Sequence, residues 1–259
     1  MKSIYNFDKD VKDDESNFKK ELNYSKYLPQ QFFRWAICGA TGSGKTNFLL
    51  HTLIGNEDTF KFDRIWFYVA DPTEDKYEVL KSRLDEVANQ AVQTMLKMGH
   101  RIPKPDIYKV FTSIDEIPKL TKEIKDEKLS KILIIDDYNG DKKTDAWLDS
   151  YIKKCRKFHV NIVYLAQNYY QIPTTIRQNM DYISIYEIPD MRQMRNLAQT
   201  YSLGVNKDKF MEIYKKATSR PYMPLTIDVS PKTRIHNPEL MWRSGLLPIS
   251  EMEKNEGNK

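Results

Sequence analysis

Short apolar runs alternate with longer amphipathic stretches along most of this sequence. The runs are rich in Ile, Val, Tyr and Phe and mostly lack strict polar alternation, as expected of strands that helices cover on both faces. The predicted strands are Phe32–Cys38, Arg64–Val69, Tyr108–Phe111, Lys131–Ile135, Asn161–Ala166, Tyr182–Ile188 and Pro224–Val229. The predicted helices are Lys45–Leu53, Asp75–Met98, Ile117–Lys128, Thr144–Phe158, Pro189–Tyr201 and Lys207–Thr218. This alternation predicts an α/β fold, a doubly wound and mainly parallel sheet with helices on both faces.

The chain divides into three predicted parts. Residues 1–30 are charged and aperiodic, and we expect an N-terminal arm that packs on the domain or on a neighbouring subunit. Residues 31–230 carry the alternating pattern without an internal repeat, which predicts a single domain. Residues 231–259 are a predicted C-terminal extension, and we expect its polar end, Glu251–Lys259, to be disordered.

Composition narrows the class of protein. The chain has 41 Lys and Arg against 36 Asp and Glu, and this mild excess permits a polyanionic partner without requiring one. Two cysteines, Cys38 and Cys155, are too few for a disulfide framework and indicate a reducing compartment. The opening Met1–Glu15 is polar, and apolar runs such as Ile132–Ile135 are far shorter than a membrane helix. We therefore expect a soluble, intracellular protein with no membrane partner.

One segment fits the phosphate-binding loop G-x-x-x-x-G-K-[ST] in full. It follows the apolar stretch Trp35–Cys38 and precedes a predicted helix, which is the context that the motif requires. Its glycines let the backbone wrap closely around phosphates at a helix N-terminus. Lys45 is predicted to reach the β- and γ-phosphates of ATP, and Thr46 to place its hydroxyl on Mg²⁺. The predicted loop residues are Gly39, Ala40, Thr41, Gly42, Ser43, Gly44, Lys45 and Thr46.

A pair of acids follows the predicted strand Lys131–Ile135. At the C-terminal edge of that strand, Asp136 is predicted to face the phosphate loop and to hold Mg²⁺ through its waters. Asp137 is then the candidate that orients or deprotonates the attacking water. The alternative is that the two acids cap the turn that follows, Tyr138–Gly140.

A carboxamide ends the predicted strand Asn161–Ala166. Gln167 follows that strand directly, where its side chain could bind the γ-phosphate or the attacking water and so sense hydrolysis. The alternative is a loop amide that hydrogen-bonds its own backbone.

The order of these motifs resembles the FtsK/HerA superfamily of DNA-translocating ATPases. After the phosphate loop and the two acids come Arg156–His159, the strand ending in Gln167, and Tyr169–Asn179. Within the superfamily, the chain is most similar to the genome-packaging ATPases of large DNA viruses and virophages. That branch has a similar Asp-Asp pair and a similar Leu-(Thr/Ala)-Gln … Ile-Pro-x-x-Ile-Arg-x-Asn stretch. The resemblance covers Phe32–Val229 and is most specific from Gln167 to Asn179.

This resemblance implies a RecA-like P-loop fold and a homo-oligomeric ring, often hexameric, that moves double-stranded DNA with ATP and Mg²⁺. In viruses the cargo is the genome and the destination is the capsid, so a capsid protein is a further implied partner. The implied location is the host cytoplasm or a viral factory, or the virion itself. Cellular members commonly carry Glu as the second acid, and Asp137 is one methylene shorter, about 1.5 Å.

Ring ATPases usually complete each site with an arginine from the next subunit. The candidates here are Arg177, in the family-like stretch, and Arg156, with Arg192 and Arg195 ranked below them. The alternative for each is a cation near a helix C-terminus or on a solvated surface. DNA contacts are expected to go to phosphates. Their candidates are His100, Arg101, Lys104 and Lys153–Lys157.

Three other functions remain open from the residues alone. A P-loop kinase would bind a phosphate acceptor, but the chain has no arginine-rich lid and a kinase has no need of Gln167. A nucleotide-switched assembly or scaffold ATPase would turn over slowly and would ignore DNA. A HerA-like cellular translocase or helicase would separate strands.

Overall fold

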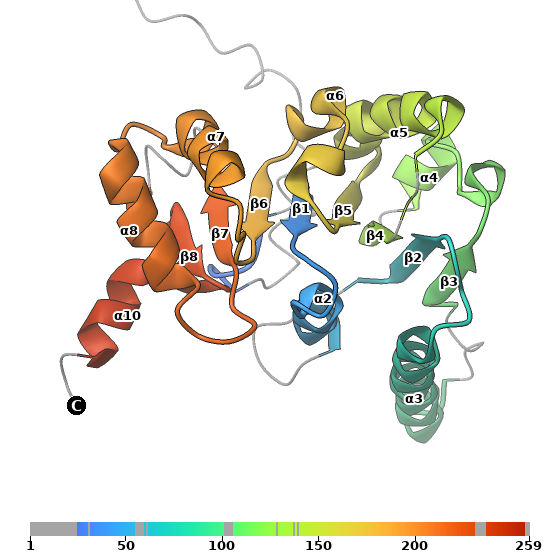
Figure 1. The fold of residues 1–259 in the computed structure, drawn as a ribbon. Helices are drawn as coiled ribbons and strands as arrows, with labels where there is room; N and C mark the ends of the chain where they lie inside the picture. Colours follow the sequence, from blue (N-terminus) through green and yellow to red (C-terminus); the bar gives the residue numbers. More distant parts are fainter. Residues whose placement is uncertain are drawn as a thin grey trace, which may run out of the picture.

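A nine-stranded sheet forms the centre of the chain (Figure 1). The computed structural model describes residues 25–30, 32–54, 60, 62–100, 106–127, 129–136, 138, 140–230 and 237–256. Within them the strand order is β3-β2-β4-β5-β1-β6-β7-β8-β9. The strands are β1 (Arg34–Cys38), β2 (Arg64–Val69), β3 (Tyr108–Phe111), β4 (Lys131–Asp136), β5 (Val160–Ala166), β6 (Tyr182–Ile185), β7 (Leu225–Asp228), β8 (Trp242–Ser244) and β9 (Leu247–Pro248).

The strands from β3 to β6 in that order pair in parallel, and β7, β8 and β9 add antiparallel strands at one edge. Helices supply the crossovers that parallel pairing requires. The helices are α2 (Lys45–Ile54), α3 (Asp75–Lys97), α4 (Lys122–Asp126), α5 (Lys142–Lys154), α6 (Thr174–Arg177), α7 (Met191–Tyr201), α8 (Lys207–Ala217) and α10 (Ile249–Glu256). Among the described helices, none has the length and hydrophobicity that a bilayer crossing needs.

Side chains of the strands enter two hydrophobic cores, one on each face of the sheet. In β4, Ile132 and Ile134 belong to the core that includes residues of α2 and α3, whereas Leu133 and Ile135 belong to the core that includes residues of α5, α7 and α8. Burial on both faces explains the continuous apolar runs in the sequence. Figure 1 shows α5, α6 and α7 on one side of the sheet and α2 and α3 on the other. The predicted mainly parallel α/β fold with helices on both faces is confirmed.

Helix α4 is much shorter than the helix predicted over Ile117–Lys128. It spans only Lys122–Asp126, and the side chain of Thr121 caps it by accepting a hydrogen bond from the backbone N–H of Ile124 at 3.5 Å. Pro118 has no N–H to donate, and the backbone around it does not continue the helix. The predicted start of the helix is therefore wrong.

Helix α5 begins two residues before the predicted start at Thr144. The carboxylate of Asp141 caps it by accepting hydrogen bonds from the backbone N–H groups of Lys143 and Thr144, at 2.9 and 3.0 Å. The helix ends at Lys154, and a 3₁₀ turn, η3 (Cys155–Phe158), leads into β5. An aspartate at this position is a strong N-cap signal, because its carboxylate satisfies free backbone donors.

The end of the chain folds onto the sheet. The prediction of disorder from Glu251 onward is wrong as far as Glu256, because these residues belong to α10, while residues 257–259 lie outside the described part. Met252 is buried at 2% exposure, and the hydroxyl of Tyr27 donates to the Glu251 carboxylate at 3.1 Å. Buried Ile249 and Met252, together with the polar contacts of Glu251, thus hold a helix with a largely polar sequence.

A buried ion pair joins β8 to β7. Arg243 and Asp228, each 1% exposed, lie 3.5 Å apart, and the guanidinium of Arg243 also donates to the backbone carbonyl of Tyr27 at 3.0 Å. Residues 25–30 of the predicted arm therefore pack against the predicted C-terminal extension. Residues 1–24 of that arm lie outside the described part, and the boundaries at residues 30 and 230 stay predictions.

Candidate functional site

The phosphate-loop sequence connects the C-terminal end of β1 to the N-terminal end of α2. Cys38 pairs with Ala166 of β5, and the backbone N–H of Gly39 donates to the carbonyl of Ala166 at 3.1 Å. The loop then turns, with the N–H of Ser43 donating to the carbonyl of Ala40 at 3.1 Å. The strand, loop and helix that the motif requires are all present.

Glycine is needed in this loop for space and for backbone conformation. A Cβ atom at Gly39 would lie 2.7 Å from both the hydroxyl oxygen of Ser43 and the Cβ of Tyr186, which is too close. Gly42 has a φ of +77°, in the left-handed region that glycine adopts most readily. The result is a tightly turned backbone at the start of α2, an arrangement that suits an anion.

Lys45 reaches back across the loop. Its Nζ donates to the carbonyls of Gly39 and Ala40, at 2.7 and 3.1 Å, and the residue is only 8% exposed. The hydroxyl oxygen of Ser43 is buried and has no hydrogen-bond partner among the described residues. A phosphate oxygen could accept a hydrogen bond from the Ser43 hydroxyl, so the residues of the loop fit a nucleoside triphosphate.

Asp136 is the last residue of β4 and contacts two side chains from the start of α3. It is 1% exposed; the hydroxyl of Tyr77 donates to its Oδ2 at 2.9 Å, and Nζ of Lys76 lies 3.2 Å from the same oxygen. Lys76 also pairs with Glu74 at 2.9 Å. Burial works to lower the pKa of Lys76, but the hydrogen bonds and charges of Glu74 and Asp136 outweigh it and raise that pKa. Lys76 therefore stays cationic beside Asp136.

The oxygen donors at this edge of the sheet suit Mg²⁺. Thr46 is the second residue of α2, and Asp136 ends β4, which is separated from β1 by β5 alone. Hydroxyl and carboxylate oxygens are ligands that Mg²⁺ accepts, together with phosphate oxygens and water. In this structure the ammonium of Lys76 forms an ion pair with the Asp136 carboxylate. Asp137, the predicted water-activating acid, lies outside the described residues.

A pocket of about 580 Å³ lies at the C-terminal edge of β2 and β5. Ala166, which binds Gly39 of the phosphate loop, is among its lining residues, as are Gln167 and Glu74. Asp145 lines it too, and burial, followed by the charge of Asp141, raises the pKa of the Asp145 carboxyl. The fold thus gathers polar side chains from three segments next to the phosphate loop, where they could position water.

Gln167 and its neighbour Asn168 have different surroundings. Asn168 caps the 3₁₀ turn η4 (Tyr169–Gln171): its Oδ1 accepts from the N–H of Tyr170 at 2.9 Å, and its own N–H donates to the Gln171 side chain at 3.1 Å. The alternative of an amide that binds its own backbone therefore holds for Asn168. Gln167 is exposed and lines the pocket, as its predicted position requires.

Arg177 lies against aromatic rings of its own subunit. Its guanidinium is 4.9 Å from the ring centroid of Tyr169 and 5.2 Å from that of Tyr170, and it donates to the hydroxyl of Thr174 at 2.8 Å. The Tyr169 hydroxyl is in turn hydrogen-bonded to that of Tyr201. These contacts fix Arg177 close to η4, immediately after the strand that carries Gln167.

Arg156 lies at the N-terminal ends of the parallel strands, opposite the ends that carry the phosphate loop and Asp136. It belongs to η3, which precedes β5, and it contacts Asp181 at 3.5 Å, while Asp181 also binds Arg34 at 2.9 Å. Its side chain is 53% exposed. The surrounding segment forms an exposed basic edge, composed of Lys153, Lys154, Arg156 and Lys157.

The remaining candidate cations are spread over the surface. Arg192 and Arg195 are exposed on α7, and His100 is exposed after α3. Arg101 and Lys104 lie outside the described residues. Among the described candidates, the basic edge has the densest run of exposed cations in the sequence.

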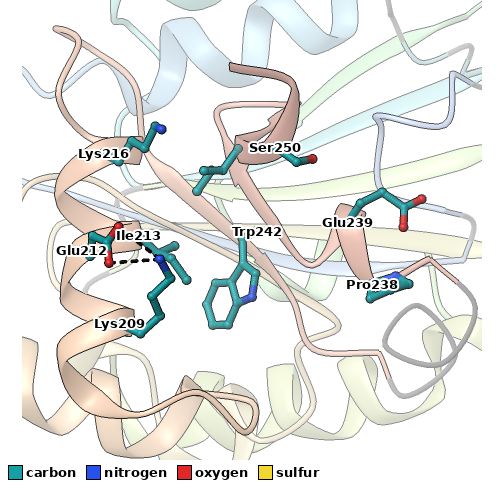
Figure 2. A pocket seen from close by; sticks show the side chains of 9 residues that line it. Lys209, Glu212, Ile213, Lys216, Pro238, Glu239, Trp242 and Ser250 are labelled. Carbon is teal, nitrogen blue, oxygen red and sulfur yellow. Dashed lines mark hydrogen bonds and ion pairs between the residues drawn. The ribbon is translucent and has the colours of Figure 1, made fainter. Parts of the chain in front are cut away.

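A second pocket, of about 240 Å³, lies between α8, the turn before β8, and α10 (Figure 2). Trp242 and Ile213 form its apolar part, and Lys209 and Glu212 pair with each other beside them at 3.0 Å. It shares no lining residue with the pocket beside the phosphate loop. This second pocket therefore contains none of the predicted site residues.

Three residues close to the site could not be identified from the sequence. Lys76 and Tyr77 reach Asp136 from α3, and Tyr222 lies against Gly44 of the phosphate loop, where a Cβ atom would be 3.2 Å from its ring. None belongs to a recognisable motif. The one sequence signal is Pro221, because proline is common at the turn position that precedes a residue with positive φ, here Tyr222.

The comparisons with known proteins agree with this geometry. A sequence profile of the family described as Poxvirus A32 protein matches residues 19–230. No significant match is found among curated protein sequences. The genome packaging NTPase B204 from Sulfolobus turreted icosahedral virus 2, in complex with AMPPCP, has a TM-score of 0.50 and 15% sequence identity, covering 76% of this chain and 92% of that chain.

Two further solved structures are similar at lower scores. B204 in complex with sulfate has a TM-score of 0.47 and 15% identity, over 76% of this chain and 91% of that chain. The cytoplasmic domain of the Thermomonospora curvata Type VII secretion ATPase EccC has a TM-score of 0.40 and 13% identity, over 77% of this chain and 23% of that chain.

The family match includes every predicted site residue from the phosphate loop to Arg177. The AMPPCP complex of B204 shares the fold over most of both chains. The family match therefore shows the family of the chain, and the similarity to the AMPPCP complex of B204 shows its fold. The chain belongs to the poxvirus A32 protein family, and its fold is that of a P-loop ATPase.

Proposed function

We propose that this P-loop ATPase is an ATP-driven translocase of double-stranded DNA that packages a viral genome into a capsid. The observation that carries the proposal is the phosphate loop, Gly39–Thr46, placed beside Asp136 and a polar pocket in a chain of the A32 family. B204, which shares the fold, is a genome packaging NTPase, and this supports the choice of cargo.

Different residues would take different roles in ATP hydrolysis. The loop backbone and Lys45 would hold the β- and γ-phosphates, and Thr46 and Asp136 would hold Mg²⁺, which neutralises charge on the phosphates when bound. Gln167, in the pocket beside the loop, would orient the attacking water, with Asp137 as its base. Water must be held in line because the loop binds phosphate without itself supplying a nucleophile.

We propose a homo-oligomeric ring, hexameric or similar, around duplex DNA, with a capsid protein as docking partner. The proposed location is the host cytoplasm or a viral factory, or the virion. An arginine that reaches a neighbour's site needs such a ring, because the site is otherwise incomplete. The exposed basic edge is the described surface best suited to DNA phosphates, which carry the sequence-independent part of binding.

Duplex DNA of any sequence is expected to raise the ATPase rate, and its apparent affinity should fall steeply with salt. Each DNA phosphate that the protein neutralises should make the slope of log K against log salt more negative by about 0.9. The measurement is phosphate release against DNA concentration at several salt concentrations, with two unrelated sequences. A rate that ignores DNA at low salt would favour a scaffold ATPase, and strand separation would favour a HerA-like helicase.

Lys154→Ala combined with Lys157→Ala tests the basic edge. The double variant should bind DNA more weakly and with a salt slope shallower by about 1.8, while ATP turnover without DNA stays unchanged. Lys142→Ala with Lys143→Ala is the matched control, because these two lysines are exposed at the other end of α5. An equal loss of affinity in both double variants would place the DNA elsewhere.

Asp136→Asn and Asp137→Asn are expected to fail at different steps. Asp136→Asn removes charge from the proposed metal site and should weaken nucleotide binding only when Mg²⁺ is present. Asp137→Asn should bind ATP·Mg²⁺ normally and hydrolyse it slowly, so that ATP remains bound. Titration of nucleotide with and without Mg²⁺, followed by single-turnover hydrolysis, separates the two. Normal hydrolysis by Asp137→Asn would show that Asp137 is not the base, and Gln167 would be the next residue to test.

A further inference from the structure

Tyr222 has a backbone conformation that a tyrosine rarely adopts. Its φ is +62°, and the N–H of Met223 donates to the carbonyl of Arg220 at 3.3 Å, closing a turn over Arg220–Met223. With Pro221 at the second position, such a turn strongly prefers glycine where Tyr222 stands. A bulky side chain in this region is uncommon and directs attention to function.

The ring of Tyr222 lies on the phosphate loop. A Cβ atom placed on Gly44 would be 3.2 Å from Cδ1 of Tyr222 and 3.4 Å from its Cβ. The residue is nevertheless 71% exposed. An aromatic ring that contacts the loop along one edge and leaves most of its surface open is available to a flat ligand.

The segment that carries Tyr222 is anchored next to α2. The N–H of Gly245 donates to the carbonyl of Pro224 at 2.8 Å. A Cβ atom at Gly245 would lie 3.1 Å from the sulfur of Met223 and 3.6 Å from the ring of Phe48, which is on α2. The antiparallel edge of the sheet therefore holds this turn against the helix that follows the phosphate loop.

The position of Tyr222 matches the nucleoside end of a bound nucleotide. Asp136 and Gln167, on the β4 and β5 side of β1, mark the end where the γ-phosphate and metal belong. A nucleotide whose γ-phosphate lies there would have its nucleoside end towards β6 and β7, on the other side of β1. Tyr222 stands in the segment that leads directly into β7.

We infer that the Tyr222 ring stacks on the base of the nucleotide that the phosphate loop holds. The inference rests on the proposed nucleotide site and adds a base-binding residue to it. Stacking uses the flat face of the base, which every base has, and larger rings stack over more area. Purine nucleotides should therefore bind more tightly than pyrimidine nucleotides, with a small difference between ATP and GTP.

Tyr222→Gly separates base binding from phosphate binding. The variant should lose about ten-fold or more in affinity for AMPPCP·Mg²⁺, measured by calorimetric titration. Its affinity for inorganic tripolyphosphate·Mg²⁺, which has no base, should be unchanged. Without nucleotide, its melting temperature should be equal or higher, because glycine relieves the backbone strain. Tyr222→Phe should bind AMPPCP as the wild type does.

Leu203→Gly is the matched control. Leu203 also has a positive φ, of +47°, in a turn after α7, so glycine relieves the same strain without removing a ring from the loop. Its nucleotide affinity should not change. If Tyr222→Gly loses AMPPCP and tripolyphosphate equally, or loses neither, the stacking role is overturned while the nucleotide site stands. Failure of the wild type to bind either ligand would overturn the nucleotide site itself.

Discussion

Lys45→Ala is expected to lower ATP turnover by about 10³-fold while leaving the fold intact. The ammonium of Lys45 lies over the loop, within 2.7 and 3.1 Å of the carbonyls of Gly39 and Ala40, where phosphate charge must be stabilised. That charge grows on the transferred group in the transition state, so removing the ammonium should reduce the rate more than the ground-state affinity. The substitution removes the Lys45 side chain beyond Cβ, and Lys45 belongs to neither hydrophobic core.

Phosphate release and thermal melting, measured on the same preparations, test this expectation. Asn47→Ala is the matched control, since Asn47 is exposed in the first turn of the same helix. Its turnover and melting temperature should stay close to those of the wild type. Turnover by Lys45→Ala near the wild-type rate, with an unchanged melting temperature, would show that this loop is not the hydrolytic site.

The parallel part of the fold could be predicted because its signal is local and strong. Lys131–Asp136 is buried at every position, and such a strand shows an unbroken apolar run whatever lies next to it. β8 and β9 gave no comparable signal, because they span only three and two residues and form by pairing, β8 with β7 and β9 with β8. An arginine such as Arg243 in β8 would be expected at the surface from the sequence, and its contacts with Asp228 and the Tyr27 carbonyl explain its burial.

The same contrast between local signals and tertiary pairing applies to the residues of the candidate site. The phosphate loop is contiguous, so its spacing alone identifies it. Tyr77 and Asp136 are 59 residues apart, and the parallel pairing of β2 with β4 brings them together, with Val69 opposite Asp136. Tyr222 reaches Gly44 through the antiparallel edge that the sequence did not reveal. Residues that act by tertiary contact need the topology first.

The other large effect is expected at the arginine that completes a neighbour's site. Removal of such a finger should reduce turnover by about 10³-fold or more and leave ATP binding almost unchanged. Arg177 remains the first candidate. Its guanidinium lies 4.9 Å from the ring of Tyr169, which follows β5 by three residues, and the last residue of β5, Ala166, pairs with Cys38 at the phosphate-loop end of β1.

The surroundings of Arg177 shape the choice of variant. Its guanidinium lies over the rings of Tyr169 and Tyr170, so Arg177→Ala also removes packing beneath α7. Arg177→Lys keeps a cation but loses the planar fork that grips phosphate oxygens. Both variants should bind ATP and assemble normally, and both should hydrolyse poorly. Gel filtration and nucleotide titration establish the first two properties before rates are compared.

Mixing variants tests whether the arginine acts between subunits. Arg177→Ala mixed with Lys45→Ala should recover some activity, because a subunit with an intact loop can then sit beside one with an intact arginine. Arg156→Ala is the matched control: this arginine is 53% exposed at the N-terminal ends of the parallel strands, where it pairs with Asp181. Activity that returns only in the Arg156→Ala mixture would make Arg156 the finger. If neither mixture regains activity, the hypothesis that an arginine completes a neighbour's site loses its main support.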